Sequence, residues 1–219
     1  MSPSTLIEAL RGDARLLTPG PRVLPSQQVA DVHRARLIAG MAEAAAEKGY
    51  ADVTIADVVK RAQVSRRTFY EHFPDKQACF LAAYEASADL VIALIAHAVA
   101  DERLPWQQRI AAGVSVYLQT LASEPGLTRV FLIDILSAGP EALRRRRAVH
   151  GRFAELLQTL ASRHRAELPP GFAIEPTMAI AIIGAVNELV LLAVEGGRAD
   201  DLPRLAEVAN RLVLASLTA

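Results

Sequence analysis

Apolar residues recur at intervals of three and four along most of the chain, which is the spacing of one face of an α-helix. The first clear example contains Leu37, Ile38, Met41 and Ala45, and Gly49 stands where such a helix would end. No run of alternating β-branched residues competes as a strand. The pattern therefore predicts an all-α fold.

Capping residues and helix breakers divide this pattern into elements. Thr54, Ser65 and Asp75 are residue types that cap helix N-termini, and Pro74 is a helix breaker. The helices predicted in this way span residues 27–48, 54–62, 65–73, 75–100, 105–123, 127–137, 140–167, 176–195 and 202–217.

We expect three parts along the chain. Residues 1–27 form an extension rich in proline and glycine, in which Ser4 or Thr5 caps one short helix that ends near Leu10. This arm is either only partly ordered or touches DNA or the helical bundle. A helix-turn-helix head follows over residues 28–75, and a larger helical body covers residues 76–219.

Composition and charge limit the class of protein only loosely. Hydrophobic residues make up 52% of the chain, which is ample for a core, and 24 basic residues balance 24 acidic ones. A DNA-binding protein needs only a local basic surface, so a net charge of zero neither supports nor excludes nucleic acid. The single cysteine, Cys79, fits a reducing, cytoplasmic compartment.

The most apolar stretch, residues 178–194, is interrupted by Asn187 and Glu188. It falls just short of the roughly 18 uninterrupted apolar residues that suggest a membrane span. We interpret it as a buried helix of a soluble protein.

The most informative chemistry lies between Thr54 and Lys76. Two short amphipathic helices are joined by the tight link Gln63-Val64-Ser65, which indicates a helix-turn-helix. The second helix of such a unit enters the major groove of DNA with its N-terminal residues leading. These residues are Ser65, Arg66, Arg67 and Thr68.

Their side chains suit base recognition, because arginine can bind guanine through two hydrogen bonds and a threonine methyl can touch thymine. Tyr70, His72 and Lys76 flank this face with donors for phosphate oxygens. Thr54 and Lys76 also stand at helix N-termini, where free backbone N–H groups attract phosphate.

The run from Val64 to Lys76 closely resembles the TetR family of transcriptional regulators. Gly49-Tyr50, the segment 54–58 and Ala62 also stand where that family's pattern places them. The resemblance implies that Thr54, Tyr70, His72 and Lys76 contact the DNA backbone and that Arg66, Arg67 and Thr68 face bases. It also implies a body that dimerises through its last two long helices and often holds a small effector.

One departure concerns the turn between the two short helices. Gln63 stands where the family usually has glycine. If the backbone there needs a positive φ, Gln63 is slightly strained.

The segment 176–195 is apolar almost all round, so it must be covered on every side. A second subunit can bury one side of this helix; the alternative is a core helix of a single chain. The residues that we expect at the dimer seam are Ile183, Val186, Asn187, Leu189, Val190, Leu205, Val208 and Leu212. Asn187 and Glu188 would form hydrogen bonds or ion pairs across the seam, contact an effector, or be exposed.

Candidates for an effector pocket are weaker. Trp106, Tyr117, Phe131 and Met178 are aromatic or flexible apolar residues that could line one, and each is also compatible with ordinary core packing. The run Arg144–Arg147 is interpreted as a solvated helix face paired with acidic residues; the alternative is a site for an anionic effector or DNA.

The sequence therefore predicts a dimeric repressor that binds an inverted-repeat operator in double-stranded DNA and is released by an apolar small molecule. The alternative is a DNA-binding regulator or architectural protein without an effector. The sequence contains no paired carboxylates, nucleophile elbow, phosphate loop or metal-ligand spacing, so we expect no enzyme and no cofactor.

Overall fold

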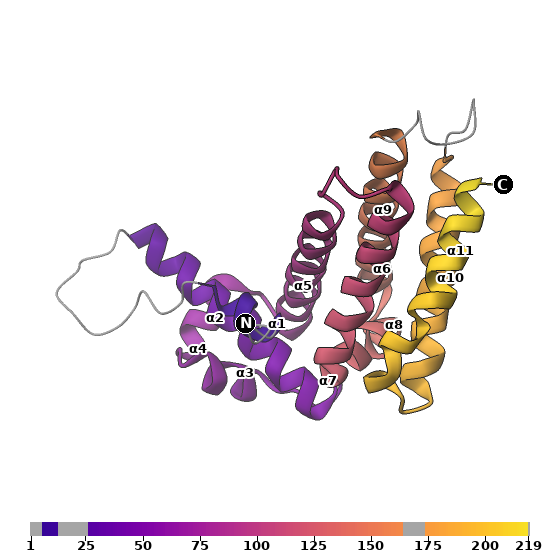
Figure 1. Ribbon diagram of the computed structural model, residues 1–219. Coiled ribbons are helices and arrows are strands. Elements are labelled where there is room, and N and C mark those ends of the chain that lie inside the picture. Colours follow the sequence, from indigo (N-terminus) through magenta and orange to yellow (C-terminus); the bar gives the residue numbers. More distant parts are fainter. Residues whose placement is uncertain (1–5, 13–25, 164–173, 219) are drawn as a thin grey trace.

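The computed structural model describes residues 6–12, 26–163 and 174–218. Every regular element in these ranges is helical, as the periodicity predicted (Figure 1). The elements are α1 (Leu6–Arg11), α2 (Ser26–Lys48), α3 (Ile55–Ala62), α4 (Arg66–His72), α5 (Lys76–Ala98), α6 (Trp106–Ser123), α7 (Pro125–Arg129), the π-helical turn η2 (Val130–Asp134), α8 (Ile135–Ser137), α9 (Pro140–Arg163), α10 (Pro176–Glu195), the 3-10 helix η3 (Ala199–Leu205) and α11 (Ala206–Thr218).

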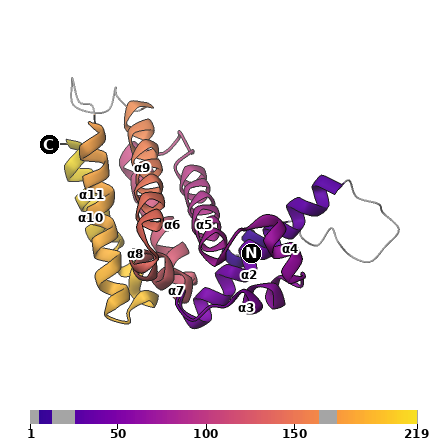
Figure 2. The same ribbon diagram turned by 180° about the vertical axis from the view of Figure 1, so that it is seen from behind.

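The helices form a small head and a larger body. Helices α1 to α4 lie together at one end, and α5 runs from them into the body, where α6, α9, α10 and α11 stand beside one another (Figures 1 and 2). In both views α10 and α11 lie on the side of the body farthest from α4. The surface of this outer pair is therefore remote from the head.

Local capping explains where the head helices start. The Thr54 hydroxyl accepts a hydrogen bond from the Asp57 backbone N–H at 3.2 Å, and the Asp57 carboxylate accepts one from the Thr54 backbone N–H at 3.0 Å. This reciprocal pair is a capping box. Asp75 likewise accepts from the Ala78 backbone N–H at 2.7 Å, which starts α5.

Two predicted helices differ from the structure, both because of proline. The predicted helix 127–137 begins two residues earlier, since Pro125 occupies a first-turn position where its missing N–H costs nothing. It also contains the π-helical turn η2. The predicted helix 202–217 starts as the 3-10 helix η3, which contains Pro203. The end of predicted helix 140–167 and the predicted caps Ser4 and Thr5 lie outside the described residues.

The N-terminal segment contributes a docked helix. Leu6 and Leu10 of α1 are both 7% exposed, and α1 packs against α2 and α5. Arg11 forms an ion pair with Glu43 of α2. Of the alternatives left open by the sequence, contact with the helical bundle is the one that the structure shows for residues 6–11.

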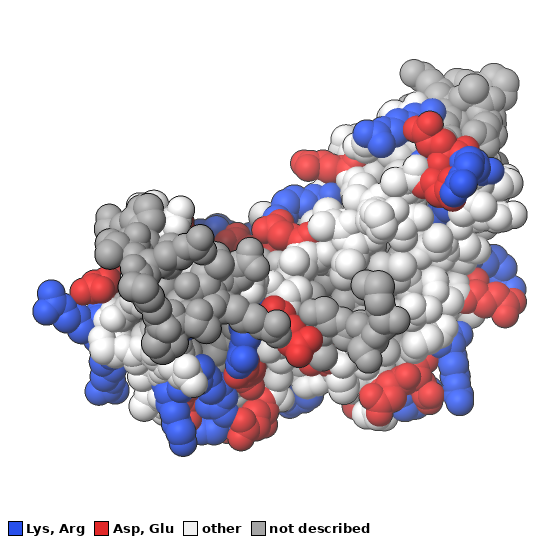
Figure 3. Space-filling model, turned by 60° about the vertical axis from the view of Figure 1, so that its left-hand side comes forward, with Lys and Arg blue, Asp and Glu red and all other residues white. Residues whose placement is uncertain are grey.

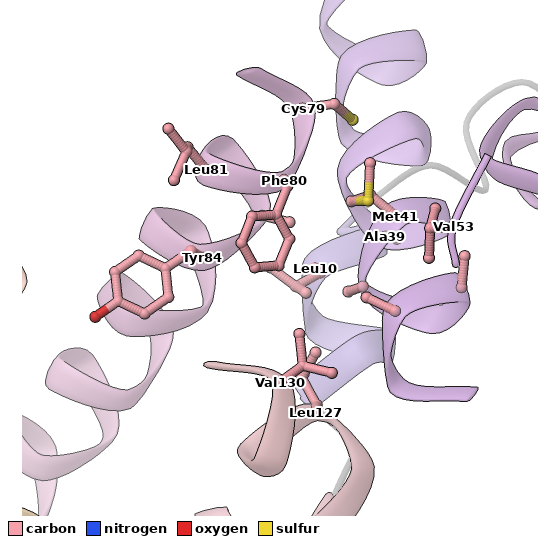
Figure 4. Packing of buried hydrophobic residues seen from close by; sticks show 14 of the residues in the cluster. Leu10, Ala39, Met41, Val53, Cys79, Phe80, Leu81, Tyr84, Leu127 and Val130 are labelled. Carbon is pink, nitrogen blue, oxygen red and sulfur yellow. The ribbon is translucent and has the colours of Figure 1, made fainter. Parts of the chain in front are cut away.

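One hydrophobic cluster joins the head to the body. Phe80 of α5 is fully buried; its ring stacks on Tyr50 of the head at a centroid distance of 4.1 Å and lies 6.0 Å from Phe131 of the body. Met41 from α2 and Val130 from η2 belong to the same cluster, which Figure 4 shows around Phe80. Head and body therefore do not have separate cores at this junction.

A second hydrophobic cluster fills the rest of the body between α6, α9, α10, η3 and α11. By length and composition, α5 and α10 would each be able to cross a membrane, and α10 is longer than the interrupted stretch in the sequence suggested. In the fold, α5 packs against α2, α6 and α9, while α10 packs against α9, η3 and α11. Both helices thus have the packing partners of core helices.

The head also touches the body through a close backbone approach. A Cβ atom added at Gly126 of α7 would lie 2.6 Å from the Ala46 carbonyl oxygen of α2. A backbone oxygen cannot move aside as a flexible side-chain end can. Only glycine therefore allows α7 to sit this close to the end of α2.

We expect Gly126→Ala to destabilise the protein by about 1–3 kcal/mol, the usual cost of overpacking. The matched control is Gly151→Ala, because a Cβ atom added at Gly151 of α9 would have no neighbouring atom within 4 Å. This control should raise stability by about 0.5–1 kcal/mol. Urea unfolding of the three proteins measures both effects, and equal stability of the two variants would contradict the proposed contact.

Candidate nucleic-acid interface and cavity

The first turn of α4 carries the predicted base-reading residues on an exposed face. The helix begins at Arg66, and both Arg66 and Arg67 are exposed, while Thr68 is half-buried. Ser65 caps the helix: its hydroxyl accepts from the Thr68 backbone N–H at 3.0 Å and lies 2.9 Å from the Thr68 hydroxyl. Ser65 and Thr68 therefore fix the start of α4, and the two arginines project from it.

Arg67 has an ion-pair partner within α4. Its Nε lies 3.1 Å from Oε1 of Glu71, one helical turn away, and its side chain is 91% exposed. An exposed ion pair of this type contributes little to stability. Arg67 can therefore exchange Glu71 for another acceptor at small cost.

The turn before α4 has the strained conformation that the departure from the family pattern suggested. Gln63 has φ 54° and ψ 44°, which is the left-handed region. This conformation costs a residue with a Cβ atom roughly 1–2 kcal/mol. The Gln63 and Val64 backbone N–H groups both donate to the Val59 carbonyl, and the Val64 bond is 3.2 Å long. The turn is therefore tight and sets the angle between α3 and α4.

Tyr70 and His72 flank the exposed face in different environments. Tyr70 is 56% exposed, so its hydroxyl is available for a phosphate oxygen. His72 is half-buried, and its ring lies 6.4 Å from that of His33 in α2. Burial, helped by His33 and Arg34, lowers the pKa of His72. At neutral pH, His72 therefore offers a phosphate an uncharged N–H donor.

Lys76 and Thr54 are engaged within the head. The Lys76 ammonium donates to the carbonyls of Tyr50 and Ala51 at 3.0 and 3.1 Å and lies 4.6 Å from the centre of the Tyr50 ring. The Thr54 hydroxyl donates to Asp57 at 2.7 Å. Lys76 thus holds the turn before α3 while retaining one free N–H and its charge. Spacing along the chain does not reveal this positioning role.

Basic side chains project from the outer edges of the head, mixed with acidic ones (Figure 3). Because the protein has no net charge, it can attract a phosphate backbone only through basic side chains placed locally, such as these.

The turn at Tyr50 and Ala51, which Lys76 holds, also contacts the body. The Tyr50 backbone N–H donates to the Asp134 carboxylate at 2.8 Å, and Arg129 lies 3.8 Å from the other carboxylate oxygen. Asp134 ends η2, which also carries Phe131. A movement of η2 would therefore reach the turn that Lys76 holds.

Behind α5 lies a cavity of about 170 Å³ with mostly apolar walls. Helices α5, α6, α9 and α10 supply most of the lining, and residues of α7 and η2, Leu6 of α1 and Val213 of α11 complete it. Two predicted pocket residues, Tyr117 and Phe131, line the cavity.

The other two predicted pocket residues do not line this cavity. Met178 is 51% exposed in the first turn of α10, and Trp106 is buried in the second hydrophobic cluster at the start of α6. Amphipathic spacing identifies the apolar side of a helix but does not indicate which part of that side borders empty space.

A short hydrogen-bond network crosses one wall of the cavity. The Tyr117 hydroxyl donates to the Asn187 amide oxygen at 2.9 Å, and the Asn187 amide nitrogen lies 2.7 Å from Nε2 of His150. Because that nitrogen can only donate, His150 Nε2 is an acceptor and the imidazole is neutral. Burial, with a smaller effect of Arg146, lowers the pKa of His150 to about 4.

Several of the seam residues predicted on α10 are buried within the single chain. Val186, Asn187 and Val190 are 8%, 9% and 0% exposed within a single chain, so they present almost no surface to a second copy. Ile183 is half-buried and lines the cavity. These side chains point towards the body core, where α9, η3 and α11 pack against α10.

The exposed stripe of α10 consists of other residues than the predicted seam, namely Ala181, Ala185, Glu188 and Leu192. On α11, Val208 is 44% exposed, while the predicted Leu205 and Leu212, like Leu189 of α10, are half-buried. The outer surface of the α10–α11 pair therefore exposes the apolar residues Leu192 and Val208 together with the charged Glu188.

The four arginines of the run Arg144–Arg147 do not behave alike. Arg144 and Arg145 form ion pairs with Glu141, and Arg145 also pairs with Glu85 at 2.8 Å. Arg147 is exposed. These three fit the prediction of a solvated helix face, whereas Arg146 lines the cavity.

Residues 37–83 match the family described as bacterial regulatory proteins, tetR family. The HTH-type transcriptional regulator EthR of Mycobacterium tuberculosis is 31% identical over 86 residues, which cover 38% of this chain and 39% of the relative. EthR of Mycolicibacterium smegmatis is 29% identical over 97 residues, covering 44% and 41%. The chain thus matches about two fifths of the length of these relatives.

Solved structures extend the similarity to the whole fold. The fatty acid degradation regulator FadR of Bacillus halodurans has a TM-score of 0.72 at 19% identity, over 91% of this chain and 98% of that one. The FadR regulator of Bacillus subtilis, solved in complex with stearoyl-CoA, has a TM-score of 0.70 at 18% identity, over 83% and 97%. At these identities the comparison shows a shared fold.

The neutral, half-buried state of His150 predicts a pH dependence of stability. Between its ordinary pKa of 6.5 and the lowered value of about 4, the unfolded chain binds a proton at His150 that the folded chain does not. The free energy of unfolding should therefore fall as the pH falls through this window.

Chemical denaturation of wild type and His150→Gln between pH 7 and pH 4 isolates this contribution. The stability difference between the two proteins should shift in favour of the variant as the pH falls. Exposed His97→Gln serves as the control and should follow the wild type. A pH-independent difference between wild type and His150→Gln would contradict the neutral assignment.

Proposed function

We propose that this chain is a TetR-family transcriptional regulator that binds operator DNA as a dimer and represses transcription until a small molecule releases it. The observation that carries the proposal is the first turn of α4, where Arg66 and Arg67 are exposed directly after a tight, left-handed turn. A helix presented in this way suits the major groove.

Base reading and backbone contact are divided between neighbouring positions in this proposal. Arg66, Arg67 and Thr68 face base edges, while Tyr70, His72 and the remaining N–H of Lys76 bind phosphate oxygens. Thr54 contributes through the N-terminus of α3 and its own cap, because its hydroxyl hydrogen already bonds to Asp57.

Two copies of α4 must lie about 34–36 Å apart to meet successive major grooves of one face of DNA. A two-fold dimer satisfies this requirement and makes the operator an inverted repeat. We place the dimer seam on the outer stripe of α10 and α11, which exposes Leu192 to 53% and Val208 to 44%. Ala181 and Ala185 would allow the helices of two copies to approach closely.

Release by a ligand follows from the position of the cavity. The cavity lies behind α5, the helix that joins head and body. One of its wall residues, Phe131, belongs to η2, and Asp134 at the end of η2 accepts a hydrogen bond from Tyr50 of the head. A ligand releases DNA only if it binds more tightly to the conformation that cannot bind DNA. The stearoyl-CoA complex of the B. subtilis FadR regulator supports an effector site in this fold. A repressor of this kind acts in the cytoplasm.

Selection from a random pool of duplex DNA tests the DNA-binding proposal. Wild type should enrich an inverted repeat, and the double variant Arg66→Ala/Arg67→Ala should lose that enrichment, because each good bidentate contact contributes about 1–3 kcal/mol of base discrimination. The matched control Arg144→Ala/Arg147→Ala removes two exposed arginines from α9 and should select the same sequence as wild type. Enrichment of one sequence by all three proteins would refute the assignment of α4.

The dimer seam is tested by Leu192→Arg. Two unpaired arginines on the two-fold seam should yield a monomer in light scattering, and loss of the second head should weaken operator binding by about 10²-fold or more. Leu94→Arg on α5 is the control, because Leu94 is also exposed, at 46%, but lies outside the stripe. A dimeric Leu192→Arg variant would exclude this seam.

A further inference from the structure

Arg146 brings a positive charge to the wall of an otherwise apolar cavity. In α9 the residues that line this cavity include Arg146, Val149, His150, Phe153 and Leu157, which is one face of the helix. Arg146 is the member of the four-arginine run that falls on this face, and it is half-buried. Its place at the cavity is therefore set by helical register.

The charge of Arg146 has no ion-pair partner in the part of the chain that the structure describes. None of the described residues lining the cavity is an aspartate or glutamate, and Arg146 forms no ion pair with any described residue. A half-buried charge without a partner is unfavourable, and a bound anion removes that cost. A cationic ligand, in contrast, would meet an uncompensated like charge.

Two hydroxyl groups of α5 face the same cavity. Ser87 is 3% exposed, and its hydroxyl has no hydrogen-bond partner. Tyr84, one turn earlier, is 6% exposed and also lines the cavity. Burial raises the pKa of Tyr84 to about 12 despite the opposing charge of Arg146, so its phenol remains a donor.

Ion pairs on the neighbouring surface align these groups with Arg146. Arg145 pairs with Glu85, and Arg152 pairs with Asp89, so α5 and α9 run alongside each other over these residues. Ser87 lies midway between Glu85 and Asp89 in α5. Ser87 is therefore level with the part of α9 that begins at Arg146, and both residues line the cavity.

We propose that the cavity binds a small organic acid, whose carboxylate lies between Arg146 of α9 and the Ser87 and Tyr84 hydroxyls of α5. The apolar part of the acid packs against the remaining, hydrophobic walls. This assignment rests on the proposed function, since it names the chemical class of the molecule that would release DNA. It assigns a role to one arginine of a run that DNA binding does not use.

Size and charge restrict the ligand further. A cavity of about 170 Å³ is close to the roughly 150 Å³ cavity that holds one benzene molecule, so the apolar part is a single ring or a short chain. Because His150 is neutral, Arg146 alone decides the sign of the charge that is accepted.

Isothermal titration of the purified protein tests the proposal with paired probes. Octanoate is compared with octanol, and 3-phenylpropanoate with 3-phenylpropanol, because each pair differs mainly in the carboxylate. Wild type should bind at least one acid about tenfold or more tightly than its alcohol, as a charge-assisted hydrogen bond implies. Arg146→Gln should abolish that preference, and Ser87→Ala should reduce it.

The control is Arg147→Gln, which removes the adjacent exposed arginine and should keep the wild-type preference. Circular dichroism checks that each variant is folded; if Arg146→Gln is not, the Ser87→Ala result decides. Equal affinities for acid and alcohol, absence of binding by both acids, or binding of octanoyl-CoA without octanoate would overturn the proposal.

Release of the selected operator is measured separately, so that the two proposals can fail independently. An acid that binds through Arg146 without releasing DNA would support the ligand class and refute ligand-released repression. Release by octanol but not by octanoate would support ligand-released repression and refute the organic acid.

Discussion

Phe80 is shielded from solvent because aromatic rings from both halves of the molecule pack around it, Tyr50 from the head and Phe131 from the body. Interiors this densely packed respond to a displaced side chain as a unit, and they do not deform locally without cost. The angle between head and body therefore depends on this one cluster. The close approach of Gly126 to Ala46 adds a second, backbone-level restriction on the same angle.

The functional elements are arranged around this junction. The turn at Tyr50 receives a hydrogen-bond partner from the body, Asp134, and two hydrogen bonds from Lys76 at the start of α5. Lys76, which the family pattern places at the DNA phosphates, thus also stabilises the conformation of the head. The outer stripe of α10 and α11 lies on the opposite side of the body, so the proposed pairing of two copies there would leave both heads uncovered.

Local signals in the sequence predicted the elements well, because caps and breakers act within a few residues. Thr54 and Asp75 start helices where expected, since their bonding partners lie three residues away. Residues whose role depends on distant neighbours were harder to place. Val190 and Met178 lie on one apolar helix, yet the first is buried and the second exposed, because only the packing of neighbouring elements such as α9 and α11 distinguishes its sides. Arg146 differs from Arg145 for the same reason.

The cavity is built from residues that span almost the entire chain, from Leu6 of α1 to Val213 of α11. Its full lining is therefore assembled only once the N-terminal helix and the last helix have both docked. A molecule bound there is therefore linked to complete folding, and its binding free energy adds to global stability by mass action. The concentration of such a molecule in the cell would set how much folded protein survives proteolysis as well as how much of it occupies DNA.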